Sequence, residues 1–211
     1  TDVVPVGDKA LWTHEPFGGE IVNDKLYGRG AADRKGGVAD FVAAVASFVN
    51  TWPNEGSISL IITGDEEGDA EFGTVKMVEW MTANDQVPDF CLVGEPTNPT
   101  QLGDIEEHFA RVGGAYKAEW RVSAHPFVTP VGNHINLVCD AIEAVTGQVP
   151  ELSTSGGTSD ARFITTICPV AEFGLVGKTM HQVDEYVDVG DIDRLAKIYE
   201  NVLNRFFKVE R

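Results

Sequence analysis

Residues 60–69 read LIITGDEEGD, an apolar run that stops at a glycine and continues as three acids in a row. An apolar run that ends in carboxylates is typical of a buried parallel strand, because open α/β sheets keep their functional sites at the carboxyl ends of the strands. Side chains alternate along an extended chain, so Glu66 and Glu67 point in different directions. One can bind a metal ion while the other faces a substrate. The alternative is an exposed acidic turn, which is the commoner setting of an isolated acidic triplet.

The apolar residues around this stretch alternate between helical and strand spacing. Helical spacing predicts helices over residues 38–49, 72–81, 133–146, 162–167 and 192–207. Short apolar runs predict strands over residues 58–62, 89–93 and 169–173, and the end of a strand over 1–6. Residues 8–25 are expected to form a loop. Strands that alternate with helices in this way indicate an α/β fold with a mostly parallel sheet.

Composition excludes several classes of partner. The formal net charge of −17 argues against nucleic acid and against anionic membrane surfaces, because both repel an acidic protein. The three cysteines are far apart and form no CxxC pair, so they indicate neither a disulfide framework nor a cysteine zinc site. No apolar run is long enough for a transmembrane helix, and no signal peptide is evident. We therefore expect a soluble cytoplasmic protein.

Acids and one histidine lie in turns or directly after apolar runs. These candidates are Asp2, Asp33, Glu66, Glu67, Glu95 and His181. Together they would form a mixed oxygen and nitrogen site, which suits zinc, cobalt or manganese better than calcium. A set of acids larger than one ion needs suggests two ions with a bridging carboxylate, and a spare glutamate as general base. Taken singly, each acid reads as a solvated loop residue and the histidine as an ordinary core or surface one.

Several motifs carry a resemblance to a known family. They are TDVVP (1–5), LYGRGAAD (26–33), TGDEEG (63–68), VGEPT (93–97), LSTSGGTSD (152–160) and GKTMHQVDE (177–185). In this order they resemble the M20 family of dinuclear zinc amidohydrolases, over nearly the whole chain. The Ser/Thr-rich loop at 152–160 is most similar to that of the desuccinylase branch. The resemblance implies hydrolysis of N-succinyl-LL-2,6-diaminopimelate to succinate and LL-2,6-diaminopimelate, a step of lysine and diaminopimelate biosynthesis.

The resemblance also implies a fold and a metal-ligand set. The fold would be a three-layer α/β/α catalytic domain of the zinc-peptidase type. Asp33 would bridge two zinc ions, for which cobalt can substitute. Glu67 would bind one ion and Glu95 the other, and His181 would be a further ligand.

Roles beyond metal binding follow from the same resemblance. Glu66 would be the general base that takes a proton from the bridging water. Asp2 would hydrogen-bond a metal-bound histidine and fix its tautomer. The contacts to the substrate carboxylates would come from Ser155, Gly156, Thr158, Ser159 and Arg162.

The chain also departs from the family pattern. Family members have a histidine ligand two residues before the position of Asp2, where this sequence has no residue, and a lid or dimerisation domain with a further histidine. We expect residues 1–104 and 123–211 to form the two parts of the catalytic domain, with 105–122 as a remnant or linker in place of that domain. Arg34 stands where methionine is common. These differences predict weak or absent activity and a monomer, although the family forms homodimers.

Two alternatives stay open. The chain could be another M20 enzyme, such as a dipeptidase or an acetylornithine deacetylase-like deacylase, which would differ in what the 152–160 loop recognises. It could also be a non-catalytic acidic α/β module that binds a metal or a partner. Metal content partly distinguishes a catalytic core from the non-catalytic module. About two zinc ions per chain would support the catalytic core, and none would support the module.

Overall fold

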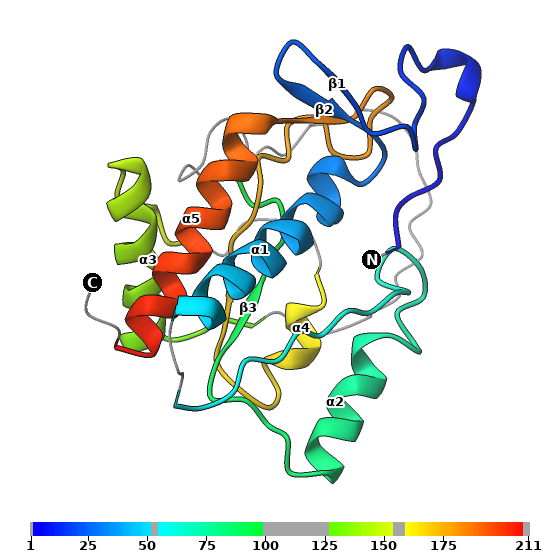
Figure 1. Cartoon of the computed structure of the whole chain (residues 1–211). Coiled ribbons are helices and arrows are strands. Elements are labelled where there is room, and N and C mark those ends of the chain that lie inside the picture. The colour runs from blue at the N-terminus through cyan, green and yellow to red at the C-terminus, as the bar shows by residue number, and fades with distance from the viewer. Residues whose placement is uncertain (1, 52–54, 99–126, 154–158, 209–211) are drawn as a thin grey trace, which may run out of the picture.

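The computed structural model describes residues 2–51, 55–98, 127–153 and 159–208. Its helices are α1 (Gly36–Thr51), α2 (Thr74–Ala83), α3 (Asn133–Thr146), α4 (Ala161–Ile164) and α5 (Val189–Phe206) (Figure 1). Its strands are β1 (Glu20–Val22), β2 (Lys25–Tyr27), β3 (Cys91–Val93), β4 (Val170–Glu172) and β5 (Tyr186–Asp188). Two short helical turns, η1 (Lys9–Leu11) and η2 (Ala31–Lys35), precede α1.

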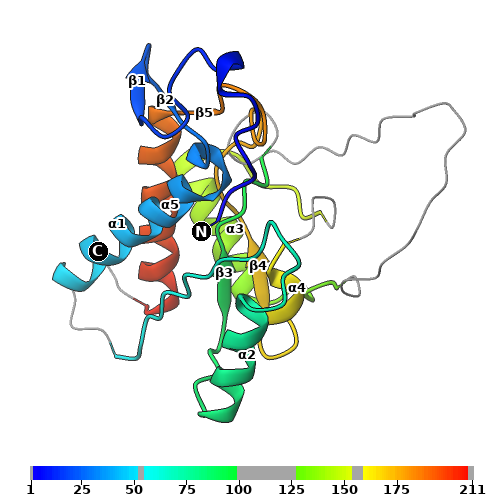
Figure 2. The same cartoon turned by 90° about the vertical axis from the view of Figure 1, so that its right-hand side faces the viewer.

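The parallel pair β3–β4 lies between two layers of helices. Helices α1 and α5 lie on one side of this pair and α4 on the other (Figure 2). The larger apolar core contains residues of α1, α3 and α5 and receives Leu92 of β3. The smaller core lies around α4 and receives Cys91 and Val93. Alternate residues of β3 thus enter opposite cores, as a strand covered on both faces requires.

A second sheet has the order β1-β2-β5 and is antiparallel. Its register places Lys25 opposite Asp188 and Tyr27 opposite Tyr186. Strand β2 leads directly into η2, and the loop that carries His181 leads into β5. The pairing of β2 with β5 therefore brings η2 close to the loop that carries His181, although more than 140 residues separate them in the sequence.

Most of the expected elements are confirmed. The α/β class is correct, and all five expected helices are present within a few residues of their predicted bounds. The strands expected near residues 89–93 and 169–173 are β3 and β4. The linker expected over residues 105–122 lies outside the described residues.

The strand expected over residues 58–62 is wrong, because this segment has no regular structure. A strand needs a hydrogen-bonded neighbour. Here a cavity of about 570 Å³ is lined both by residues 56–63 and by residues 85–94, which include β3. Leu60 and Ile62 remain 44% and 58% exposed, so the apolar run is not buried as a central strand would be.

Two other expectations are corrected near the N-terminus. Residues 2–6 form no strand, and the expected loop over residues 8–25 contains η1 and the start of a hairpin, β1–β2. Asn23 and Asp24 form its two-residue turn with φ of 50° and 59°. An Asn-Asp pair tolerates this conformation, so the sequence did contain a hairpin signal.

All three cysteines are free, and burial raises the pKa of the Cys91 thiol to about 12. Within the described residues, no helix combines the length and the apolar character needed to cross a membrane.

Asp40 is an acid inside the helical layer. It lies on α1 with 2% of its surface exposed, and its Oδ2 has no hydrogen-bond partner among the described residues. Burial and the nearby Asp193 carboxylate raise the pKa of Asp40 to about 7. Ionised Asp40 therefore destabilises the folded state.

We expect Asp40→Asn to flatten the dependence of stability on pH. The pKa is higher in the folded protein (about 7) than in the unfolded chain (near 3.8), so folded Asp40 holds its proton more tightly. The free energy of unfolding then falls as the pH rises through this window. Between about pH 5 and pH 8 the variant should lose roughly 1–3 kcal/mol less stability than the unchanged chain, as measured by urea unfolding. The exposed-site variant Asp89→Asn is the control and should follow the unchanged chain.

Candidate metal centre

The η2 turn presents Asp33 to the site. Gly30 begins the turn with φ of +87°, and an added Cβ there would lie 2.7 Å from the Val3 side chain. Glycine is therefore required both for its backbone conformation and for the close approach of Val3. Asp33 follows three residues later and is 6% exposed.

Glu185 holds this turn in place from the other end of the chain. Its Oε1 accepts the backbone N–H groups of Ala32 and Asp33 at 3.0 and 3.1 Å, and its Oε2 accepts from Arg29 Nη1 at 2.7 Å. The side chains of Arg29 and Glu185 are 3% and 0% exposed. A buried carboxylate needs such a complete set of partners, so the contacts at Glu185 fix both the path of η2 and the position of Asp33.

Three side chains from distant segments meet beside this turn. His181 Nε2 lies 2.7 Å from Asp33 Oδ2 and 3.2 Å from Glu67 Oε1. The ligand atoms of these three residues all lie within 4.8 Å of one another. Burial and the neighbouring Asp33 raise the pKa of Glu67, and His181 opposes this. Two carboxylates and an imidazole at this spacing fit one divalent ion of the zinc type.

The side chains of Asp65 and Asp2 hold the loop that carries Glu66 and Glu67. The Asp65 carboxylate accepts the backbone N–H groups of Glu71 and Phe72 at 2.7 and 3.0 Å. Asp2 Oδ2 accepts the Glu67 N–H at 3.2 Å. Asp2 therefore lies beside the metal-ligand candidates, and its contact here is to the backbone of Glu67.

Glu66 and Glu95 both contact the guanidinium of Arg34. Arg34 Nη2 lies 2.8 Å from Glu66 Oε2 and 3.2 Å from Glu95 Oε1. Burial raises the pKa of Glu66, and it raises the pKa of Glu95 to about 8 although Arg34 acts in the opposite direction. Glu95 is thus near the site, but its carboxylate is not among the three clustered ligands.

Two of the five residues that we expect to contact the substrate, Ser159 and Arg162, lie within the described part of the chain. Ser159 is buried and donates a hydrogen bond to Glu172 Oε1. The Arg162 guanidinium lies 4.7 Å from the Phe163 ring centre and makes no ion pair with any acid in the described part of the chain. The other three, Ser155, Gly156 and Thr158, lie outside the described residues.

Sequence patterns did not identify three residues of this centre. In the sequence, Arg34 stands out only as a departure from the family pattern, and Glu185 and Asp160 are only members of longer motifs. Asp160 Oδ2 accepts from Thr74 Oγ1 at 2.6 Å and lies 3.8 Å from Arg34 Nη1. The partners of Glu185 are more than 150 residues away, so no local spacing could reveal its contacts.

Several curated proteins are similar to this chain over nearly its whole length. A 40% identical relative, named succinyl-diaminopimelate desuccinylase, comes from Rhodospirillum centenum and aligns with 98% of this chain and 80% of its own. Proteins of the same name from Cereibacter sphaeroides (39% identical, 98% and 82%) and Gluconobacter oxydans (36%, 94% and 78%) also match. The first alignment runs over 307 residues against the 211 of this chain, so that relative carries residues with no counterpart here.

The fold has a relative among solved structures as well. An M20 family metallo-carboxypeptidase from Sulfolobus solfataricus superposes with a TM-score of 0.71, covering 99% of this chain and 84% of its own. At 13% identity this similarity shows the shared fold alone. The sequence profile described as peptidase family M20/M25/M40 matches residues 1–205. With that match over almost the whole length and the relatives above, the chain belongs to peptidase family M20/M25/M40.

Proposed function

We propose that this chain is a metal-dependent amidohydrolase core that hydrolyses N-succinyl-LL-2,6-diaminopimelate to succinate and LL-2,6-diaminopimelate. One observation carries the proposal: Asp33, Glu67 and His181 form a compact ligand set beside a further acid, Glu66. The relatives' name supplies the substrate. The substrate is a small molecule, and the step belongs to lysine and diaminopimelate biosynthesis.

Zinc is the metal we propose for the clustered ligands, with cobalt as a substitute. The mixed oxygen and nitrogen donors favour it over calcium or magnesium. When bound, zinc would supply a Lewis acid for the amide carbonyl and lower the pKa of a bound water. The ion would also supply positive charge at the site itself, so the net charge of −17 need not keep an anionic substrate from binding there.

The chain's own residues would handle the protons and the substrate. Glu66 would accept a proton from the attacking water and deliver it to the leaving amine. Its raised pKa, which burial causes, favours both steps near neutral pH. Asp2 would hold the Glu67 segment through the backbone contact described above. We assign the substrate carboxylates to Ser155, Gly156, Thr158, Ser159 and Arg162.

We further propose that this chain is a slow catalyst and a monomer. Residues 1–104 and 123–211 would be the two parts of the catalytic domain, joined where relatives of the desuccinylase type carry a lid or dimerisation domain. The alignment of the Rhodospirillum centenum relative over 307 residues is compatible with an insertion in that relative. Without a lid, the site loses a donor to the oxyanion and a barrier to water.

A hydrolysis assay with added zinc tests the function. We expect release of succinate from N-succinyl-LL-2,6-diaminopimelate at a rate about 10²-fold or more below that of the Rhodospirillum centenum relative, because the lid contributions are missing. Equal rates would contradict the proposal that this chain is a slow catalyst. No release from a zinc-loaded chain would instead favour a non-catalytic metal-binding module. Release from an acetylated or dipeptide substrate alone would favour another M20 activity.

Substitution of the paired glutamates should separate their roles. Glu67→Gln removes a charged ligand, so zinc content after dialysis should fall. Glu66→Gln should keep the zinc and reduce turnover by about 10²–10⁴-fold, as loss of a general base does. The nearby exposed-site variant Glu71→Gln is the control and should change neither quantity. Loss of zinc in Glu66→Gln would show that the two roles are exchanged.

Glu185 provides a prediction about positioning. Glu185→Ala leaves the Ala32 and Asp33 N–H groups without their acceptor and Arg29 buried without a counter-charge. We expect the free energy of unfolding to fall by about 3–5 kcal/mol and zinc affinity to fall at least 10-fold. Glu185→Gln keeps an oxygen for the two N–H groups, so its zinc affinity should fall less, although Arg29 still loses its charged partner. Equal zinc affinities for the two variants would show that the backbone contacts do not position Asp33. Urea unfolding and zinc titration measure the two effects.

A further inference from the structure

The guanidinium of Arg34 lies among four carboxylates. Besides Glu66 and Glu95, it reaches Asp160 Oδ2 at 3.8 Å from Nη1 and Asp33 Oδ1 at 4.0 Å from Nε. The Arg34 side chain is only 12% exposed, so these acids are its main counter-charges. An arginine in this setting does what a bound cation does, because it neutralises several buried carboxylates at once.

Asp33 connects this cation to the clustered metal ligands. Its Oδ2 faces His181 at 2.7 Å, whereas its Oδ1 faces Arg34. One carboxylate therefore has a ligand set for an ion on one side and a guanidinium on the other. A carboxylate that bridges two metal ions presents its oxygens in the same divided way.

The region around Arg34 does not fit a second ion. Glu66 and Glu95 are the nearest acids there, and both lie within 3.2 Å of the guanidinium. An ion that bound Glu95 would have to displace Arg34 or lie next to its positive charge. Arginine cannot yield by deprotonation, because the guanidinium stays protonated in proteins and, against the effect of burial, the surrounding carboxylates raise its pKa further.

We propose that Arg34 is a built-in cation that replaces a second metal ion, so this chain binds one ion, on Asp33, Glu67 and His181. This inference rests on the proposed metal-dependent function and refines it, since the family resemblance implies two ions. Glu95 then belongs to the arginine network and is not a metal ligand in this chain.

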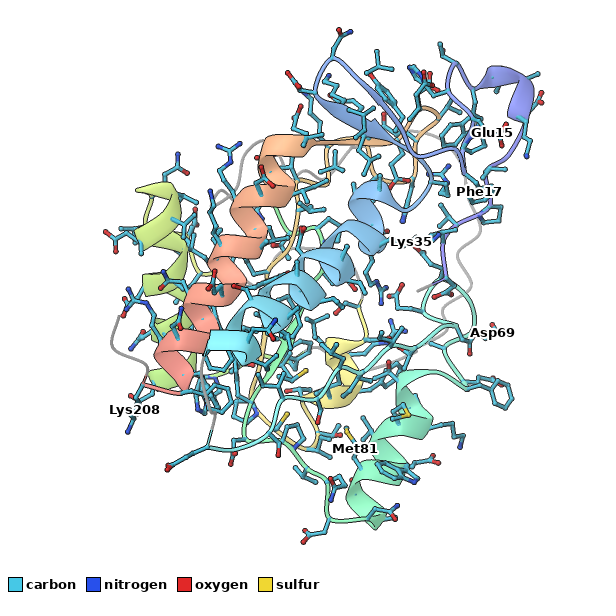
Figure 3. All side chains as sticks on the ribbon, viewed as in Figure 1. Glu15, Phe17, Lys35, Asp69, Met81 and Lys208 are labelled. Carbon is cyan, nitrogen blue, oxygen red and sulfur yellow. The ribbon has the colours of Figure 1, made fainter. Side chains whose placement is uncertain are left out.

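Zinc content tests the proposal without reference to turnover. Zinc titration with elemental analysis at saturation should show one site in the unchanged chain and two in Arg34→Met, the second weaker because only Asp33 and Glu95 would hold it. The matched control is Lys35→Met, which removes the neighbouring positive charge. Lys35 is exposed and its Nζ lies 5.9 Å from the Phe17 ring centre (Figure 3), so this control should retain about one ion.

A second pair of variants tests the same proposal through Glu95. Glu95→Gln should leave the zinc content of the unchanged chain as it is, and should remove the second ion from the Arg34→Met background. Loss of zinc from the single Glu95→Gln variant overturns the proposal. The proposal is also overturned if the unchanged chain holds two ions or none. It is overturned as well if folded Arg34→Met still holds only one ion. If circular dichroism shows Arg34→Met to be unfolded, the single Glu95→Gln result decides alone.

The outcomes also separate this proposal from the function. One ion that becomes two in Arg34→Met, without succinate release from any variant, supports the role of Arg34 and contradicts the hydrolase assignment. Two ions in a chain that releases succinate support the hydrolase and contradict the role of Arg34.

Discussion

The centre depends on one buried carboxylate, that of Glu185. It joins the turn that carries Asp33 to the loop that leads into β5, and its charge is balanced by Arg29 rather than by solvent. Because both partners are almost completely buried, neither can be removed without leaving an uncompensated charge in the interior. The turn therefore has little freedom to move. Asp33 is held rigidly before any ion arrives, which is the arrangement that tight and selective binding requires.

Charge balance explains the remaining architecture of the site. Five acids come together at this site in a chain that is already strongly acidic. They are Asp33, Glu66, Glu67, Glu95 and Asp160. Carboxylates at such distances repel one another, and burial raises the pKa of several of them. Two sources of positive charge fall on opposite sides of Asp33. One is Arg34, and the other would be an ion held by Asp33, Glu67 and His181. The protein would thus combine a permanent cation with an exchangeable one.

The sequence predicted the parts of this picture that depend on local pattern. Helices α1, α3 and α5 follow from apolar spacing, and acids directly after apolar runs identified Glu66, Glu67 and Glu95. The strand over residues 58–62 could not be judged in this way, because a strand exists only with a partner and the adjacent space is a cavity. Arg34 was visible as an unusual residue, but its acidic neighbours come from three other segments. Contacts of that kind have no signature in spacing.

The two sheets also determine when the site can form. Strand β2 pairs with β5, and β3 pairs with β4. Leu26 therefore cannot pair until Val187 is in place, and Leu92 cannot pair until Ala171 is in place. Closing such long loops has an entropic cost that must be met before the new contacts stabilise anything, and folds of this kind form slowly. During synthesis the Asp33 turn leaves the ribosome long before Glu185 and His181. The metal-binding centre is therefore completed only after Glu185 has been made, and a chain interrupted before that residue would carry the acids without the structure that organises them.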